Sequence, residues 1–358
     1  MIKRLFKRFL FYLLLLFPKM YKKIQEVDYE SATAALESEW KRKKAIVSCN
    51  NKIEYGYDLQ IVVPIYNSDR YLSQCLDSIF NQSTKFRYFV VLVDDGSNDN
   101  SRNIAQKYLV NDNCILIEKE NGGAASARNK GIEHIYGKYL TFIDSDDIIS
   151  NKFVDIMLNQ LIKKDADIVV TPLKHFSNNM NSFPKNEKVL FSKIESSNLQ
   201  GYACGYICKS LIFEHLCFPE NYWFEDTLNI FTVFTKCKKA YISNKSLYFY
   251  RQNLHGSSSV AKANLQSIET IYLTEFFASN NFLISSSKKT NTKIVLRQYV
   301  CDINRISSLQ IEIQKYAFMI LKHNCIQLLK NGLVKKKLLF RMLTNNLFNM
   351  ATTYCKLH

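Results

Sequence analysis

The stretch KYLTFIDSDD, residues Lys138–Asp147, decides the fold prediction. Its apolar, β-branched and aromatic part predicts a buried strand, and the strand ends in a run of acidic residues. Because side chains alternate along a strand, Asp144 and Asp146 are expected to point to the same side. Two carboxylates placed in this way can bind a hard divalent cation such as Mg²⁺. An isolated pair of this kind is more often a solvated acidic turn, so the interpretation depends on the surrounding sequence.

Short apolar runs alternate with amphipathic segments around that stretch. Such an alternation predicts an α/β domain, a mostly parallel sheet with helices on both faces. Open sheets of this kind bind ligands at the carboxyl ends of their strands. The expected strands are Leu59–Ile65, Phe86–Val93, Cys114–Ile117, Tyr139–Ile143, Ile168–Pro172 and Ser246–Tyr250, and the expected helices are 70–81, 98–110 and 122–135.

Polar residues gather where three of these strands end, in Pro64–Asn67, Asp94–Ser97 and Asp144–Asp147. Since the ends of parallel strands lie along one edge of a sheet, the three clusters predict one site. The carboxylates of Asp94 and Asp95 can accept hydrogen bonds from a nucleobase or a ribose. Alternatively, Asp94 and Asp95 cap the helix that follows them.

The pair Gly122-Gly123 begins a predicted helix whose N–H groups and dipole suit an anion. Arg128 lies on the second turn of this helix and can reach a phosphate group. A glycine pair alone is usually only a tight turn. Together with Asp144 and Asp146, it predicts a nucleotide diphosphate bridged by a metal ion.

Four segments resemble the successive signatures of family 2 glycosyltransferases, in the order and spacing of that family. The resemblance covers residues 58–170 and continues more loosely to about residue 260. It implies a GT-A fold, a nucleotide-sugar donor that is most often a UDP-sugar, Mg²⁺ or Mn²⁺, and inversion at the anomeric carbon. The segments are IVVPIYN (61–67), VDDGSNDNS (93–101), ENGGAASARNKGI (120–132) and YLTFIDSDD (139–147).

The same resemblance implies roles for individual residues. Asp146, with Asp144 close by, would hold the metal and the sugar, and Arg128 would lie near the donor. The residues expected to bind the donor are Pro64, Tyr66, Asn67, Asp94, Asp95, Arg128, Asp144 and Ser145.

An acidic pair further along the chain, Glu225-Asp226, occupies the place where the family has its general base. The reaction needs a base, because the acceptor hydroxyl must lose its proton as it attacks the sugar carbon. Asp226 is the expected base, and Glu225 could exchange roles with it. Alternatively, Asp226 caps a helix over 227–234, which its position also permits.

Two loops are expected to border the site. The polar segment 177–192 could cover it, and the basic segment RQNLHGSSS, Arg251–Ser259, could fold over the pyrophosphate with Arg251 and His255 as donors. The Q-x-x-R-W signature of processive family members is missing from the sequence. The chain is therefore expected to add a single sugar rather than to extrude a polymer.

The chain has 48 Lys and Arg against 32 Asp and Glu, a formal charge of +16. This excess favours a polyanion or an anionic membrane surface. Nucleic acid is not the expected partner, because neither a zinc-finger spacing nor an arginine-rich recognition segment is present. The ten cysteines are scattered without metal-site spacing, which indicates a reduced, cytoplasmic environment.

The N-terminus combines four basic residues within Lys3–Arg8 with the apolar run Phe9–Phe17. Nine helical residues span only about 13 Å, less than a hydrocarbon core of about 30 Å. The segment is expected to lie in a membrane interface. A signal peptide and a helix packed on the protein itself are the alternatives. Val334–Arg341 also mixes cations with apolar residues, and either rests on a membrane or forms the solvated face of a packed helix.

The sequence thus predicts three regions: 1–57, a basic and apolar segment with a linker; 58–260, the GT-A domain, divided near 170 into nucleotide-binding and acceptor halves; and 261–358, a helical extension. The predicted function is transfer of one sugar from a nucleotide-diphosphate sugar to a glycan or lipid-linked saccharide in surface polysaccharide synthesis. The enzyme would act peripherally on the inner face of the cell membrane. The alternatives are a nucleotidyltransferase and a membrane-bound scaffold without activity.

Overall fold

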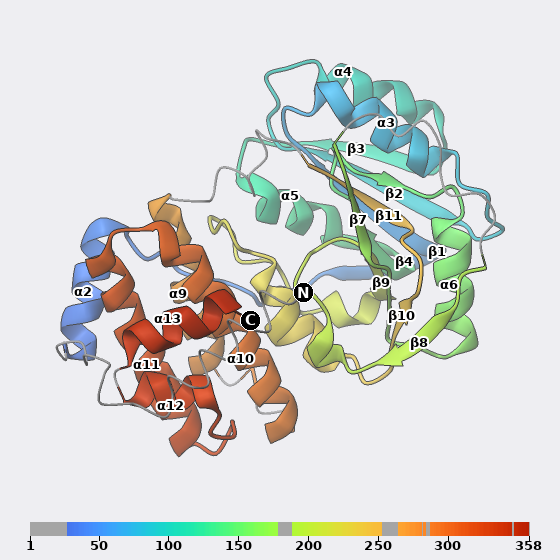
Figure 1. Cartoon of the computed structure of the whole chain (residues 1–358). Helices are drawn as coiled ribbons and strands as arrows, with labels where there is room; N and C mark the ends of the chain where they lie inside the picture. The colour runs from blue at the N-terminus through green and yellow to red at the C-terminus, as the bar shows by residue number, and fades with distance from the viewer. Residues whose placement is uncertain are drawn as a thin grey trace. The chain divides into compact units, whose positions relative to one another are not determined.

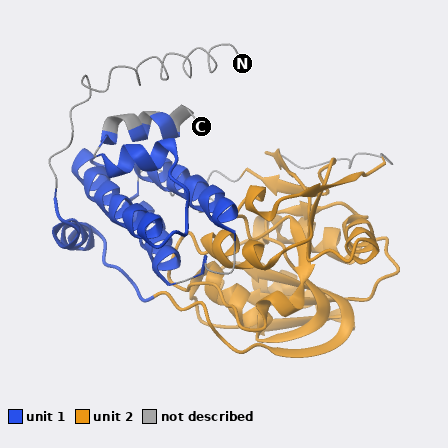
Figure 2. Cartoon of the chain, turned by 90° about the horizontal axis from the view of Figure 1, so that it is seen from below, with its two compact units in different colours: residues 1–44, 255–358 blue, residues 45–254 orange. Residues whose placement is uncertain are grey.

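The computed structural model of the 358-residue chain describes residues 27–177, 188–252, 264–280, 282–283, 287–345 and 347–357 (Figure 1). The chain forms two compact units (Figure 2). Residues 45–254 make up the sheet unit, and residues 1–44 together with 255–358 make up the helical unit. The helical unit therefore combines the two ends of the chain.

The sheet unit is built on an eight-stranded sheet with the strand order β3-β2-β1-β4-β9-β6-β10-β8. Neighbouring strands are parallel except where β9 pairs with β4 and β6 and where β8 pairs with β10. The mostly parallel sheet expected from the sequence is thus confirmed. The strands are β1 (Lys52–Ile65), β2 (Tyr88–Asp94), β3 (Cys114–Glu118), β4 (His134–Phe142), β6 (Ile168–Val170), β8 (Phe191–Ile194), β9 (Tyr206–Lys209) and β10 (Ala240–Ser243).

Helices cover both faces of this sheet, as the alternation of segments predicted (Figure 1). The odd-numbered residues of β1 from Leu59 to Ile65 belong to a core cluster with α3 (Asp69–Phe80), α4 (Ser101–Gln106) and α6 (Phe153–Lys163). On the opposite face, Val62 meets α5 (Gly123–Ile132), where a Cβ added to Gly131 would lie 2.3 Å from Val62 Cγ1. Burial on both faces explains why the end of β1, Ile61–Ile65, is a continuous apolar run.

A smaller sheet has the strand order β5-β11-β7, with β5 (Ile148–Ile149), β11 (Tyr248–Arg251) and β7 (Leu173–Phe176). β11 runs parallel to β7 and antiparallel to β5. Because β5 directly follows the acidic run Asp144–Asp147, this sheet holds the acidic run against β11. Most of the segment 177–192, and the loop that contains His255, lie outside the described residues.

The expected helix over 122–135 is shorter in the structure, because β4 already begins at His134. The buried side chain of Gln60 explains the change of direction. Its amide nitrogen donates to the carbonyl oxygens of Gly131 (2.8 Å) and His134 (3.1 Å), and its oxygen accepts from Tyr136 N–H (2.6 Å). A side chain from another strand therefore satisfies the backbone where helix becomes strand.

The helical unit contains α2 (Tyr29–Glu39), α9 (Glu269–Ser279), α10 (Lys288–Arg305), α11 (Ile311–Lys330), α12 (Leu338–Thr344) and α13 (Phe348–Leu357). The C-terminal helices expected from the sequence are confirmed. α2 belongs to this unit: Trp40 Nε1 donates to Glu269 (2.9 Å), and Arg42 forms an ion pair with Glu275 (2.7 Å). Both glutamates are buried and lie on α9.

The stretch Val334–Arg341 separates its two kinds of side chain. Val334, Leu339 and Phe340 are buried, whereas Lys335–Lys337 and Arg341 are exposed. Most apolar side chains of this stretch therefore pack inside the helical unit; Leu338 is partly buried, and the cations are exposed. Among the described residues, no helix combines the length and the apolar character needed to cross a membrane.

Candidate active site

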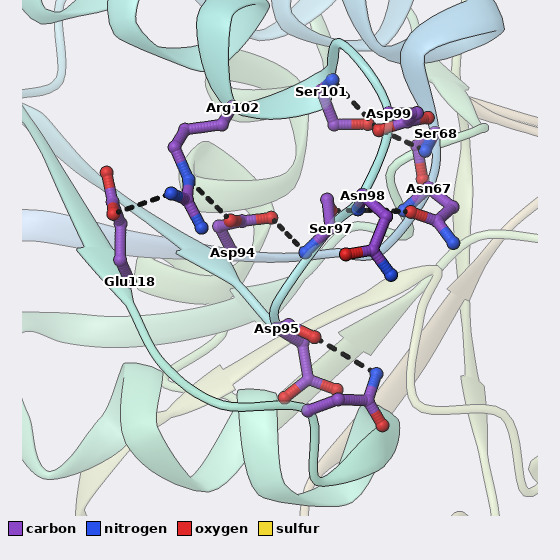
Figure 3. A network of polar contacts seen from close by, with 11 residues as sticks. Asn67, Ser68, Asp94, Asp95, Ser97, Asn98, Asp99, Ser101, Arg102 and Glu118 are labelled. Atoms are coloured by element: carbon purple, nitrogen blue, oxygen red, sulfur yellow. Dashed lines mark hydrogen bonds and ion pairs between the residues drawn. The ribbon is translucent and has the colours of Figure 1, made fainter.

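The three predicted polar clusters lie at the carboxyl ends of β1, β2 and β4. Backbone hydrogen bonds tie these ends together, from Asp95 N–H to the Ile65 carbonyl (2.8 Å) and from Ile143 N–H to the Val62 carbonyl (3.0 Å). Asn67, with a φ of 45°, accepts through its Oδ1 from Asn98 N–H at 2.9 Å (Figure 3). The structure thus brings the loops after β1 and β2 into direct contact.

Asp94 is fully buried and supports the turn after β2. Its Oδ1 accepts from Ser97 N–H at 3.3 Å, and its Oδ2 accepts from Arg102 Nε at 3.1 Å (Figure 3). Arg102 also pairs with Glu118 at the end of β3 (3.4 Å). Through Arg102, the Asp94 and Glu118 carboxylates connect the ends of β2 and β3 to α4.

Asp95 occupies the N-terminus of α5. Its carboxylate accepts from Gly122 N–H (3.0 Å), Gly123 N–H (2.7 Å) and Lys119 Nζ (2.6 Å). The N–H groups that the sequence suggested for a phosphate are thus bonded to a side chain of the protein itself. The helix dipole favours a negative charge here, and the loop after β2 supplies it.

Tyr66 and Ser145 border the same edge of the sheet. Tyr66 is 48% exposed, and the partly buried Pro64 lies two residues before it. The hydroxyl groups of Ser68 and Ser145 form a hydrogen bond of 2.7 Å. This bond joins the loop after β1 to the acidic run after β4.

The acidic run contains two kinds of carboxylate. Asp144 and Asp146 are partly exposed, whereas Asp147 is fully buried. Asp147 accepts from the Tyr248 hydroxyl and from Arg251 N–H, both at 2.7 Å. Burial raises the pKa of Asp147, and the neighbouring Asp144 and Asp146 add to that shift. Neither Asp147 nor Tyr248 was assigned a role from the sequence, although both hold the run in place.

Arg251 is a buried support in the structure, unlike the loop donor expected from the sequence. Its Nε donates to the Asp146 carbonyl (2.7 Å) and its Nη2 to Gln74 (2.8 Å). The guanidinium lies over the rings of Tyr71 (4.3 Å) and Phe176 (4.4 Å). As the last residue of β11, it fixes the backbone of the acidic run.

Arg128 connects the two halves of the candidate site. It is 5% exposed, pairs with Asp144 through Nη2 (2.8 Å) and donates through Nη1 to Glu225. Burial acts against the charge of Arg128, but the two carboxylates outweigh it and raise the pKa of the guanidinium. Burial likewise raises the pKa of Glu225, against the opposing effect of Arg128. The acidic pair near residue 225 thus meets the acidic run near residue 144.

Asp226 follows Glu225 but differs in its surroundings. It is partly exposed, and its carbonyl accepts from Asn229 N–H (2.9 Å). The segment after it contains a π-helix, η5 (Asn229–Val233), where the sequence suggested one continuous helix. π-Helical turns are rare in proteins, and those that occur are often found at functional sites.

Three groups near the acidic run could hold a metal ion: Asp144, Asp147 and Cys204 have ligand atoms within 4.8 Å of one another. Both oxygens of Asp147 already accept hydrogen bonds, and burial raises the pKa of the Cys204 thiol, which favours its neutral form. Hard cations such as Mg²⁺ and Mn²⁺ prefer oxygen ligands. Of the three, Asp144 has the partly exposed carboxylate, and its Oδ1 accepts from Arg128 Nη2 (2.8 Å). Asp146, the metal ligand expected from the sequence, is also partly exposed but does not belong to this group.

Residues 60–221 match the family model "Glycosyl transferase family 2". The putative glycosyltransferase EpsH of Bacillus subtilis (strain 168) is 30% identical over 271 residues, which cover 69% of this chain and 76% of EpsH. The chain belongs to glycosyl transferase family 2. This confirms the resemblance inferred from the four sequence segments and places the protein among the glycosyltransferases.

Two further similarities concern this family 2 member. The minor teichoic acid biosynthesis protein GgaB of Bacillus subtilis (strain 168) is 30% identical over 227 residues, which cover 60% of this chain but only 25% of GgaB. A crystal structure of S. aureus TarS 1–349 in complex with UDP-GlcNAc superposes with a TM-score of 0.67 at 19% identity, covering 82% of this chain and 89% of that one. The second similarity confirms the GT-A type of fold.

Proposed function

We propose that the protein is an inverting, metal-dependent glycosyltransferase that moves one sugar from a UDP-sugar to a glycan or lipid-linked saccharide. The observation that carries this proposal is the contact of Arg128 with both Asp144 and Glu225. Through it, a carboxylate cluster suited to a diphosphate and its metal lies beside an acidic pair suited to proton transfer. A nucleotidyltransferase needs the first of these groups but not the second.

In this proposal the donor binds to the half formed by residues 58–170. Tyr66, exposed at the end of β1, lies against the base, together with Pro64 and Asn67. Asp94 and Asp95 shape the base and ribose pocket through the loops that they hold, and Arg128, Asp144 and Ser145 border the diphosphate. Mg²⁺ or Mn²⁺, when bound by Asp146 and Asp144, offsets the negative charge that develops on the leaving diphosphate.

Asp226 is the proposed base, and Glu225 positions Arg128. Glu225 is 9% exposed and bonded to Arg128, whereas Asp226 is partly exposed. Asp226 takes the proton of the acceptor hydroxyl as its oxygen attacks the anomeric carbon. The bond from that carbon to the diphosphate breaks on the opposite side, and the configuration inverts.

The acceptor is proposed to be a lipid-linked intermediate of a surface polysaccharide, bound by the half formed by residues 171–260. GgaB bears a name in teichoic acid biosynthesis, which supports this class of product. The enzyme is proposed to work in the cytoplasm, in peripheral contact with the anionic inner face of the membrane. The exposed lysines Lys335–Lys337 of the helical unit support that contact.

The decisive experiment measures UDP release from a panel of UDP-sugars with Mn²⁺. Asp146→Ala is expected to abolish metal-dependent donor binding. Asp226→Asn is expected to bind donor normally but to lower kcat by about 10²–10⁴-fold, the usual contribution of a general base. Asp112→Asn, an exposed control, should change neither quantity.

Three results would contradict the proposal. Failure of the wild-type protein to bind any UDP-sugar would refute the choice of donor, and turnover retained in Asp226→Asn would refute the base. Release of pyrophosphate in place of UDP would indicate a nucleotidyltransferase.

A further inference from the structure

The loop 201–205 crosses from the proposed base to the acidic run. At one end, the Gly201 carbonyl accepts from Asn229 Nδ2 (3.2 Å), and a Cβ added to Gly201 would lie 3.8 Å from the Asp226 carbonyl oxygen. At the other end, Cys204 lies within 4.8 Å of the Asp144 and Asp147 carboxylates. Tyr202 and Ala203 lie between these two ends; Ala203 is buried, whereas Tyr202 is 42% exposed.

Two further rings continue from Tyr202. The Tyr250 ring lies 6.3 Å from it, measured between ring centroids, with an angle of 38° between the planes. His175 meets Tyr250 edge-on at 5.3 Å, because the two residues are paired in the register of β11 and β7. Packing between rings restricts their rotamers and gives Tyr202 a defined surface at the site.

The position of these rings in the sheet separates them from the proposed nucleotide pocket. That pocket lies at the ends of β1 and β2, whereas loop 201–205 leads into β9, on the other side of β4. Tyr248 lies two residues before Tyr250 on β11 and therefore points to the same side of that strand. Tyr248 bonds to Asp147 and Arg251 bonds to the Asp146 carbonyl, so the residues on either side of Tyr250 in β11 both contact the acidic run.

We propose that Tyr202, supported by Tyr250 and His175, binds the acceptor by stacking on a pyranose ring. Such a ring has an apolar face of C–H groups and a rim of hydroxyl groups, which matches an aromatic surface beside a carboxylate. A hydroxyl on the rim of the stacked sugar would point toward Asp226. This inference rests on the proposed function and assigns the part of its site that selects the acceptor.

The experiment compares acceptor-stimulated UDP release in the wild type, Tyr202→Ala and Tyr202→Phe. The probes are methyl pyranosides of glucose, galactose and N-acetylglucosamine, with ribitol 5-phosphate as an acyclic comparison. Tyr202→Ala is expected to lower kcat/KM for the pyranoside by about tenfold, mainly through KM, because it removes the ring. Tyr202→Phe keeps the ring and should keep the activity. Tyr55→Ala removes an equally exposed tyrosine (46%) and serves as the control.

Donor binding and slow donor hydrolysis without acceptor separate the two proposals. If Tyr202→Ala binds and hydrolyses the donor like the wild type but loses pyranoside stimulation, the stacking role stands. If pyranosides stimulate both proteins equally, or if only ribitol 5-phosphate or neither kind of probe stimulates the wild type, the stacking role is refuted while the donor site remains. If the wild type does not bind the donor, the proposed function itself fails.

Discussion

The two units of this protein differ sharply in charge. The sheet unit, residues 45–254, has 23 Lys and Arg against 23 Asp and Glu, whereas the helical unit, residues 1–44 and 255–358, has 25 against 9. The entire formal charge of +16 therefore belongs to the helical unit. In the proposed function, contact with anionic surfaces and the chemistry of sugar transfer therefore belong to different parts of one chain.

The units also treat buried charges differently. In the sheet unit, Arg128 is a buried cation between Asp144 and Glu225, two carboxylates from distant parts of the sequence. In the helical unit, the buried Asp302 accepts from the neutral groups of Thr270, Thr274 and Gln298, and the buried Glu275 pairs with the half-buried Arg42. Buried charges therefore build the site in one unit and hold neighbouring helices together in the other.

The comparison can be tested in each unit separately, because the chain has two tryptophans, Trp40 in the helical unit and Trp223 in the sheet unit. In a Trp40→Phe background the fluorescence reports on the sheet unit. In a Trp223→Phe background it reports on the helical unit. The two predictions on unfolding below use this pair of reporters.

The largest effect on stability is expected for Arg128→Met. Removing this cation leaves two carboxylates, one of them buried, without their partner, and breaking a buried ion pair costs about 3–5 kcal/mol. Urea unfolding in the Trp40→Phe background should show a loss of this size. Arg87→Met, at an exposed arginine, should cost less than about 0.5 kcal/mol. Equal losses in the two variants would mean that Arg128 has no special role in joining the halves of the site.

A smaller change in free energy is expected for binding to an anionic membrane. Replacing Lys335, Lys336 and Lys337 with Gln should weaken binding to phosphatidylserine vesicles by about 100-fold at low salt, since each lysine near such a surface contributes about 1 kcal/mol. Vesicle co-sedimentation at increasing salt measures this loss. The matched control replaces Lys152, Lys163 and Lys174, three exposed lysines of the sheet unit. Similar losses in both triple variants would show that the separation of charge does not direct binding.

The smallest of the three effects concerns pH. Burial raises the pKa of Asp302 from an ordinary value of 3.8 to about 6, although its hydrogen bonds act in the opposite direction. Between these two pH values the folded protein holds more protons than the unfolded chain, so stability falls as the pH rises through this window. The free energy of unfolding of the helical unit should therefore decrease by on the order of 2 kcal/mol from pH 4 to pH 6.

Asp302→Asn should remove this contribution, because an amide does not titrate. The free energy of unfolding, followed through Trp40 in the Trp223→Phe background, should then vary less over the same range. Glu312→Gln, at an exposed carboxylate of the same unit, should leave the pH dependence unchanged. A dependence that persists in Asp302→Asn would assign it to another group.

Local sequence patterns specify the parallel α/β core and the acidic run at its edge. Runs such as Leu59–Ile65 and Tyr139–Ile143 are local signals, since a strand buried on both faces is apolar over most of its length. The short strands β7 to β10 carry too few residues for such a pattern. They form because neighbouring strands are already in place.

The hydrogen-bond and ion-pair partners of the polar residues are set by contacts that form in the folded protein. It placed Asp95 on the N–H groups of Gly122 and Gly123, and it joined Asp144 to Glu225 through Arg128. It also grouped α2 with the C-terminal helices. These contacts connect residues far apart in the chain, and a hydrogen bond or ion pair between such residues leaves no periodic trace in the sequence. Their partners are selected by geometry once the core has formed.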